Sequence, residues 1–495
     1  MVFNSVTFVM IFLPIFFLGY FLFYFAFRTR SFVATLCNAF LFLLSLIFYA
    51  WGEPRYIFLL LVSIAVNFSV ALLVRPEGSW LKNKPLRRKL LLALGITINL
   101  LLLGYFKYMN FFIDNGGLTL VNFLLPRSLA LSAMANITLP MGISFYTFEG
   151  ISYIVDAYRG NVPTTHSLIN FGCYLTMFPH LVAGPIVRYT DILGNITKRC
   201  ITLEDVSSGA QRFILGLAKK VLIADTLGNV ADAAFSLTGP QLSPLAAWAG
   251  IVCYTLQIYH DFSGYSDMAI GLAQMMGFTF PENFRYPYTS RSCQEFWRRW
   301  HMTLSSWFRD YLYIPLGGNR CGTAHTLLNL LIVFVTCGFW HGAQWVFLAW
   351  GMYHGLFLSL ERVFKKFFQR LPALVQHAYA IAMFMGGWVL FRSMDFNHAW
   401  TYYKALFGAF PTGMETNKVW ISLFSWDVYL AIAFGILFSM PTIEWIREKW
   451  TCLAYCNGET GILSFIRLCT VLALLVVCML PLFGATYSAF IYYRF

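Results

Sequence analysis

Long apolar runs separated by short polar stretches dominate the pattern of the chain. A helix needs about 20 apolar residues to cross a hydrocarbon core about 30 Å thick. Runs of this kind occupy residues 7–27, 31–51, 55–74, 90–106, 140–156, 168–187, 213–227, 244–278, 326–340, 343–360, 377–391, 426–445 and 461–483. The pattern predicts an all-α, polytopic membrane bundle of roughly 11 to 14 helices.

The bundle is expected to form one integral membrane domain over residues 1–495. Its parts are N-terminal spans at 1–106, a core at 140–360 and C-terminal spans at 377–495. Some middle runs are short, polar or broken by proline, which indicates re-entrant or interfacial pieces. Residues 1–27 lack a basic leader and a small-residue cleavage site, so we expect a retained first span.

Composition and charge agree with this pattern. Hydrophobic residues make up 59% of the chain and charged residues only 12%. The net charge of +13 would suggest nucleic acid in a soluble protein, but here the basic residues lie in short loops and no nucleic-acid motif is present. Arg28, Arg30 and the basic loop at 75–89 predict the cytoplasmic face and place the N-terminus outside.

Ionisable side chains inside apolar runs are costly in a membrane and mark candidate functional positions. Asp261 and Asp267 are the only acidic or basic residues, histidine apart, between Asp232 and Glu282. Since they are six positions apart, they do not share a helical face and are not an obvious acid–base pair. For Asp267 we favour bonds to Ser, Tyr and backbone groups that hold the bundle. For Asp261 a structural role and a ligand-binding role are equally open.

A second candidate is the aromatic and basic stretch at 284–315. On one continuous helix, Trp300, Leu304, Trp307 and Tyr311 would share a face, while Arg298 and Arg309 would lie away from it. This predicts an amphipathic helix at the membrane surface that anchors the protein to headgroups. The alternative is a pocket in which arginines hold an anionic ligand and His301, at the border of the faces, points inward.

The third candidate is His341. It lies beside Gly342 at the centre of 40 residues, 321–360, that contain no Asp, Glu, Lys or Arg. A continuous helix of that length would be about 60 Å long, so the path must turn near this histidine. A neutral imidazole there could take a proton from a hydroxyl group in a dry pocket. The plainer interpretation is a histidine bonded to a nearby carbonyl group, which suits His354 better.

These residues resemble the membrane-bound O-acyltransferase (MBOAT) family, in which a histidine lies in an apolar stretch and a second polar residue some tens of positions upstream. Here these are His341 in Phe-Trp-His-Gly and His301 in Arg-Trp-His. Longer strings are similar to the bacterial alginate O-acetyltransferase branch: 51–54, 140–148, 156–159, 179–189, 261–271, 296–315 and 490–495. The resemblance covers essentially the whole chain.

The resemblance implies a ring of helices around a central tunnel in the bacterial inner membrane. It implies an enzyme that moves an acetyl group from cytoplasmic acetyl-CoA, with no bound cofactor or metal, to a secreted polysaccharide such as alginate or cellulose, or to peptidoglycan, with a periplasmic acetyltransferase partner. His341 would be the catalytic residue, as base or as nucleophile, and His301 its partner. Donor-binding candidates are Trp340, Trp300, Arg298, Arg299, Asp261, Arg309 and Asp310.

Two other classes of function fit the composition. A transporter or flippase for a glycan precursor would tolerate loss of His341, although few charges lie mid-span. A non-catalytic scaffold of a polysaccharide export complex would need both histidines only for stability. Within the family, a teichoic acid D-alanyltransferase or a lipid acyltransferase is the nearer alternative.

Overall fold

The structure is a computed structural model of the 495-residue chain. It describes residues 3–76, 81, 83–117, 137–237, 239–410, 420, 424–442, 444–446, 449, 460–484 and 490–491. All regular elements in these ranges are helices. Those long and apolar enough to cross a membrane are Phe8–Phe27, Val33–Gly52, Ile57–Val74, Pro85–Gly117, Thr323–His341, Ala373–Arg392 and Phe465–Gly484. The protein is therefore a multi-pass helical membrane protein, as predicted.

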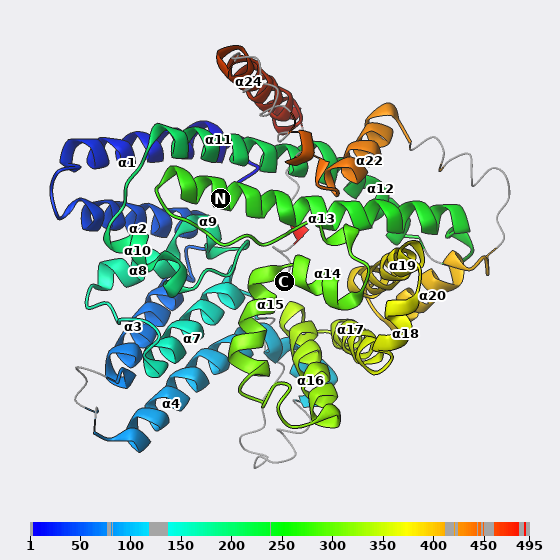
Figure 1. Cartoon of the computed structure of the whole chain (residues 1–495), viewed down its shortest axis with the longest axis horizontal. Helices are drawn as coiled ribbons and strands as arrows, with labels where there is room; N and C mark the ends of the chain where they lie inside the picture. Colours follow the sequence, from blue (N-terminus) through cyan, green and yellow to red (C-terminus); the bar gives the residue numbers. More distant parts are fainter. Residues whose placement is uncertain are drawn as a thin grey trace, which may run out of the picture.

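The N-terminal spans pack around a buried helix. α3 (Ile57–Val74) and α4 (Pro85–Leu103) both contact α7 (Ile143–Arg159), the three lying side by side in Figure 1. Asn67 and Asn99 exchange two hydrogen bonds, of 3.1 and 2.9 Å, between α3 and α4. Such pairing satisfies polar groups that would otherwise be exposed to hydrocarbon. α4 continues into a π-helical turn, η2 (Gly104–Tyr108), a distortion that often marks functional positions.

A long helix crosses the molecule next to this group. α13 (Pro244–Met275) packs along α11 (Leu203–Ala218), and Figure 1 shows the two side by side. Their backbones touch at two glycines, because a Cβ on Gly216 would lie 2.5 Å from the carbonyl oxygen of Gly264. Asp267 joins the helices through ion pairs with Arg212 (2.9 Å) and Lys219 (2.7 Å). Asp267 therefore holds the bundle together as expected, but its partners are an arginine and a lysine and not Ser, Tyr or backbone groups.

Two expected elements are interrupted. The run at 168–187 forms two short helices, α8 (Leu168–Thr176) and α9 (Phe178–Leu181), separated at Met177. The single amphipathic helix expected around Trp300 is also wrong. It is divided into α14 (Cys293–Arg299) and α15 (Met302–Phe308), and its aromatic face lies buried inside the protein, not on the membrane surface.

Three helices enclose α14 and α15 on the other side of the molecule from α7. These are α16 (Thr323–His341), α17 (Trp345–Val363) and α19 (Ala373–Arg392). α16 packs closely on α17, and α17 on α19. α24 (Thr460–Gly484) projects from the body in Figure 1. Most residues of α7 and of α13 are buried, so these two helices form much of the interior.

Candidate active site

His341 is the last residue of α16, so the turn expected there is present. The next residue, Gly342, is extended and starts the short connection to α17. Glycine allows the two helices to approach, because a Cβ on Gly338 would lie 2.2 Å from the carbonyl oxygen of Phe347. The close approach brings the imidazole of His341 against α17.

The imidazole of His341 lies in an aromatic chamber and is only 2% exposed. Its ring centroid lies 5.0 Å from that of Trp340, 5.1 Å from that of Trp350 and 5.3 Å from that of Phe391. These side chains come from α16, α17 and α19. The arrangement keeps bulk water away from a group that can accept a proton, which is what a base for a hydroxyl group in a membrane requires.

His301 also contacts one of these aromatic rings, that of Trp340. Its ring lies 6.4 Å from that of Trp340 and 4.7 Å from that of Phe262 on α13. The residue is fully buried and has a left-handed backbone conformation, with φ of 42°. This conformation is rare outside glycine, and it is over-represented at functional positions. The two histidines predicted to act together therefore contact the same indole ring, that of Trp340.

The break at His301 is produced by a distant segment. The amide of Met302 donates to the carbonyl oxygen of Asn283 (2.9 Å), and the amide of Arg285 donates to that of Arg299 (2.9 Å). These hydrogen bonds replace those that a continuous helix would make across the break. The segment at 283–285 thus fixes the backbone on both sides of the histidine.

The side chain of Asn283 also contacts the imidazole. Its Oδ1 lies 3.0 Å from Nδ1 of His301, and it accepts hydrogen bonds from the hydroxyl group (2.9 Å) and the amide (3.4 Å) of Thr303. Its Nδ2 donates to Ser266. A backbone amide can only donate, so the atom facing Thr303 is the oxygen and Nδ1 of His301 carries a proton. In a neutral ring the other nitrogen, Nε2, then has the lone pair.

Lys107 lies beside His341, although the sequence pattern did not single it out. This buried side chain donates to the carbonyl oxygen of Trp340 and to the hydroxyl group of Ser144, at 3.0 Å from the latter. Its ammonium group also lies over the indole ring of Trp340, 5.4 Å from the centroid. Lys107 is the one acidic or basic residue between Lys89 and Asp114. That isolation was the available signal, because such residues in spans are commonly functional.

The two tryptophans predicted near the site are both buried among aromatic rings, and Trp340 is part of the chamber wall. Trp340 is 3% exposed and stacks on Phe148 of α7. Trp300 is 1% exposed, and its ring lies 4.9 Å from that of Trp388 on α19. Both rings are therefore buried, and a role in excluding water from the site stays a prediction.

The predicted donor-binding residues outside the chamber have other partners. Asp261 accepts a hydrogen bond from Lys220 at 2.7 Å and one from the amide of Ile491. Arg299 pairs with Glu295 at 2.8 Å. Arg298 is exposed in the last turn of α14. The partners of Asp261 and Arg299 therefore lie outside the chamber, and Arg298 is exposed.

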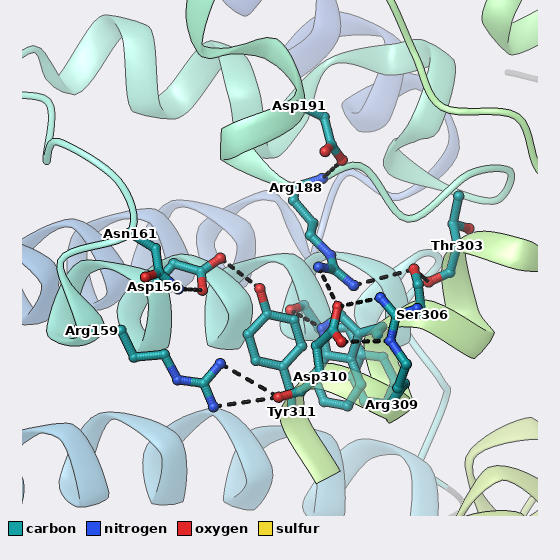
Figure 2. A network of polar contacts seen from close by, with 12 residues as sticks. Asp156, Arg159, Asn161, Arg188, Asp191, Thr303, Ser306, Arg309, Asp310 and Tyr311 are labelled. Carbon is teal, nitrogen blue, oxygen red and sulfur yellow. Dashed lines mark hydrogen bonds and ion pairs between the residues drawn. The ribbon is translucent and has the colours of Figure 1, made fainter. Parts of the chain in front are cut away.

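Arg309 and Asp310 belong to a polar cluster at the end of α15 (Figure 2). Asp310 accepts hydrogen bonds from Arg309 (2.7 Å) and from Arg188 (2.8 Å), and Arg159 binds its backbone carbonyl. Burial raises the pKa of Asp310, but the hydrogen bonds from both arginines outweigh it and hold the pKa below its usual range. The guanidinium groups of Arg159 and Arg188 lie over the ring of Tyr311, within 5.5 Å of its centroid.

A line of hydrogen bonds connects this cluster with His301. Arg188 donates to the hydroxyl group of Ser306 at 3.2 Å, and Ser306 donates to the carbonyl oxygen of Thr303 at 2.9 Å (Figure 2). Thr303 contacts Asn283, which in turn contacts His301. The cluster thereby supports the backbone that carries the histidine.

The fold and the site together define the class of this protein. It is a polytopic helical membrane protein in which two buried histidines contact one indole ring. A family model described as the membrane-bound O-acyltransferase family matches residues 43–394, most of the chain. The chain belongs to this family and is an O-acyltransferase.

Several known proteins are similar to this chain, over all or part of their length. The chain is 40% identical to a probable alginate O-acetylase AlgI of Pseudomonas putida over 100% of both chains. It is 31% identical to a peptidoglycan O-acetyltransferase of Helicobacter pylori, over 100% of this chain and 98% of the relative. Identity to a teichoic acid D-alanyltransferase of Bacillus subtilis is 27%, over 46% of this chain and 60% of the relative.

Proposed function

We propose that the protein takes an acetyl group from acetyl-CoA on the cytoplasmic side of the bacterial inner membrane and passes it outward for O-acetylation of a secreted polysaccharide. The observation that supports this most directly is the pair of buried histidines that both contact the ring of Trp340. Full-length similarity to a probable alginate O-acetylase favours alginate or a similar glycan as acceptor, with peptidoglycan as the alternative. A periplasmic acetyltransferase that completes the transfer belongs to the same proposal.

In this reaction a hydroxyl group attacks the thioester carbonyl. His341, as general base, removes the hydroxyl proton while the new C–O bond forms. The C–S bond then breaks, and the same imidazole returns the proton to the departing thiolate, so that the products are an acetyl ester and CoA with a free thiol. If His341 acts instead as nucleophile, the acetyl group resides on its ring between the two halves of the reaction.

The surrounding groups have supporting roles in this mechanism. His301 presents the lone pair of Nε2, because Asn283 holds the proton on Nδ1. Lys107 fixes the peptide carbonyl that directly precedes His341. The rings of Trp340 and Trp300 exclude water, which limits hydrolysis of the thioester.

The test is acetyl transfer by the purified full-length protein. Acetyl-CoA labelled in its acetyl group would be supplied together with the periplasmic partner and glycan, and CoA release and label transfer would be followed. Wild type should release CoA, whereas folded His341→Ala should not. Label retained on wild-type protein without acceptor would identify the nucleophile mechanism. Wild type that is inert under all these conditions, yet moves a glycan precursor across vesicles, would replace the proposal with a transporter.

A further inference from the structure

A cavity of about 570 Å³ lies between α13, α19, the end of α22 (Trp426–Phe438) with the residues that follow it, and the stretch at 288–291. Its size falls within the usual range of ligand pockets. The lining is largely apolar, and it opens at the surface, because lining residue Leu374 is 79% exposed. Representative lining residues are Leu256, Tyr288, Ile381, Phe384 and Ile436. This cavity is separate from the histidine chamber.

A basic group is part of the lining. Arg291 contributes to it, and among the described residues no ion pair involves its side chain. His377 also lines the cavity, with Nδ1 3.0 Å from the carbonyl oxygen of Ser290. The short helix α18 (Lys365–Arg370) precedes the lining segment of α19 and adds Lys365, Lys366 and Arg370 nearby in sequence.

The end of α17, near Arg291, lies on the same side of the protein as the start of α4, because Trp345 at the start of α17 donates to Asn115 near the other end of the Pro85–Gly117 helix. Arg88 bonds to the end of α7 at Tyr158, and Arg159 of the same end bonds to Asp310. Asn319 accepts hydrogen bonds from Tyr313 and from Arg362 of α17. The neighbouring residue Glu361 accepts hydrogen bonds from the backbone amides of Cys293 and Gln294. Arg291 is two residues before Cys293. The headgroup end of the cavity is therefore at the face predicted to be cytoplasmic.

We propose that this cavity binds a phospholipid with an anionic headgroup, one acyl chain lying in the apolar space and the phosphate at Arg291. An apolar lining suits an acyl chain and not a free phosphate ion, while a guanidinium group that forms no ion pair with the described residues suits a phosphate ester. Basic pockets between membrane helices on the cytoplasmic side bind such headgroups. The inference concerns lipid binding and does not depend on the proposed acetyl transfer.

The site shares a wall with the histidine chamber. Tyr288 lines the cavity and stacks on Phe384, with ring centroids 4.6 Å apart. Its other neighbours include Trp300, which directly precedes His301. The hydroxyl group of Tyr288 donates to the carbonyl oxygen of Thr255, which fixes the ring in the wall. A bound acyl chain would therefore lie against the layer of rings that encloses His301.

The experiment is photolabelling of the full chain in lipid nanodiscs. The probes are phosphatidylglycerol and phosphatidylcholine that carry the same photoactivatable group in one acyl chain, and labelled peptides are located by mass spectrometry. Phosphatidylglycerol should label α13, α19 and residues 436–440 more strongly than phosphatidylcholine does. Arg291→Gln should lower that labelling about 5-fold, as expected for loss of one headgroup contact. Arg285→Gln, an exposed arginine of the same loop, is the matched control.

Ile381→Trp fills the cavity and should remove labelling by both probes there. Gel filtration and tryptophan fluorescence establish whether each variant is folded. If Ile381→Trp does not fold, the comparison of Arg291→Gln with Arg285→Gln tests the proposal by itself. Equal labelling by the two probes, or equal effects of Arg291→Gln and Arg285→Gln, would overturn the proposal. Protection of these peptides by acetyl-CoA would also overturn it, by assigning the cavity to the acyl donor.

Discussion

Oδ1 of Asn283 accepts a hydrogen bond from Nδ1 of His301 at 3.0 Å, and this contact determines which nitrogen of the imidazole carries the proton. The two residues are 18 positions apart, and α14 lies between them in the sequence. The same segment also supplies the carbonyl oxygen that accepts the amide of Met302. Asn283 therefore sets both the backbone and the tautomer of the histidine.

Asn283→Leu should lower kcat roughly 10- to 100-fold with a much smaller change in KM, because it removes the group that orients His301 without touching substrate. Asn283→Asp keeps an acceptor oxygen and should retain much of the activity. Ser266→Ala is the control, since it removes only the partner of Nδ2. Acetyl transfer by the purified variants would be measured. Equal losses in Asn283→Leu and Ser266→Ala would refute the orienting role.

His341 and His354 offer a direct comparison between two buried histidines. His354 is fully buried, and its ring lies 4.9 Å from that of Trp350, which also contacts His341. Its Nδ1 accepts a hydrogen bond from Trp297. We expect His341→Gln to lose at least about 100-fold in kcat, the size of a general-base contribution, and His354→Gln to lose much less. If folded His354→Gln were as inactive as folded His341→Gln, the assignment of the base to His341 would fail.

The contact between α16 and α17 gives a prediction about stability. A Cβ at Gly338 would lie 2.2 Å from the backbone oxygen of Phe347, which cannot move aside like a flexible side chain. Gly338→Ala should therefore separate the helices and lower the melting temperature by several degrees, since overpacking costs about 1–3 kcal/mol. Gly104→Ala, with no atom within 4 Å of the new methyl group, should leave it unchanged or slightly higher. Thermal unfolding in detergent followed by tryptophan fluorescence measures both.

The sequence predicted the features that depend on local composition. Apolar runs located the spans of α1 to α4, α16 and α19, because hydropathy over 20 residues decides whether a helix can lie in lipid. The glycine after His341 indicated the turn at the end of α16. The resemblance to the MBOAT family is confirmed by the family match. The choice of catalytic and donor-binding residues stays a prediction.

Features that depend on distant contacts could not be predicted from local patterns. The spacing of aromatic residues around Trp300 indicated one helix, but hydrogen bonds with the backbone of residues 283 and 285 interrupt it at His301. Lys107 escaped notice because its partner, the carbonyl oxygen of Trp340, is 233 positions away. Arg309 and Asp310 were expected to bind a donor, and nothing local showed that Asp310 pairs with Arg188, 122 positions away. In each case tertiary structure supplies the partner.

The cluster in Figure 2 predicts a pH-dependent contribution to stability. The pKa of Asp310 lies below its usual value: burial raises it, and hydrogen bonds from Arg309 and Arg188 lower it further than that. The ionised carboxylate therefore stabilises the folded state at pH values above the usual pKa of about 3.9, and this contribution is lost as the pH falls through the lower pKa of the folded protein. Asp310→Asn should lower the melting temperature at pH 7, and the difference from wild type should shrink from about pH 5 downward. Asp114→Asn, outside this cluster, is the control; a difference at Asp310 that stayed constant down to pH 3 would show that the carboxylate charge contributes nothing.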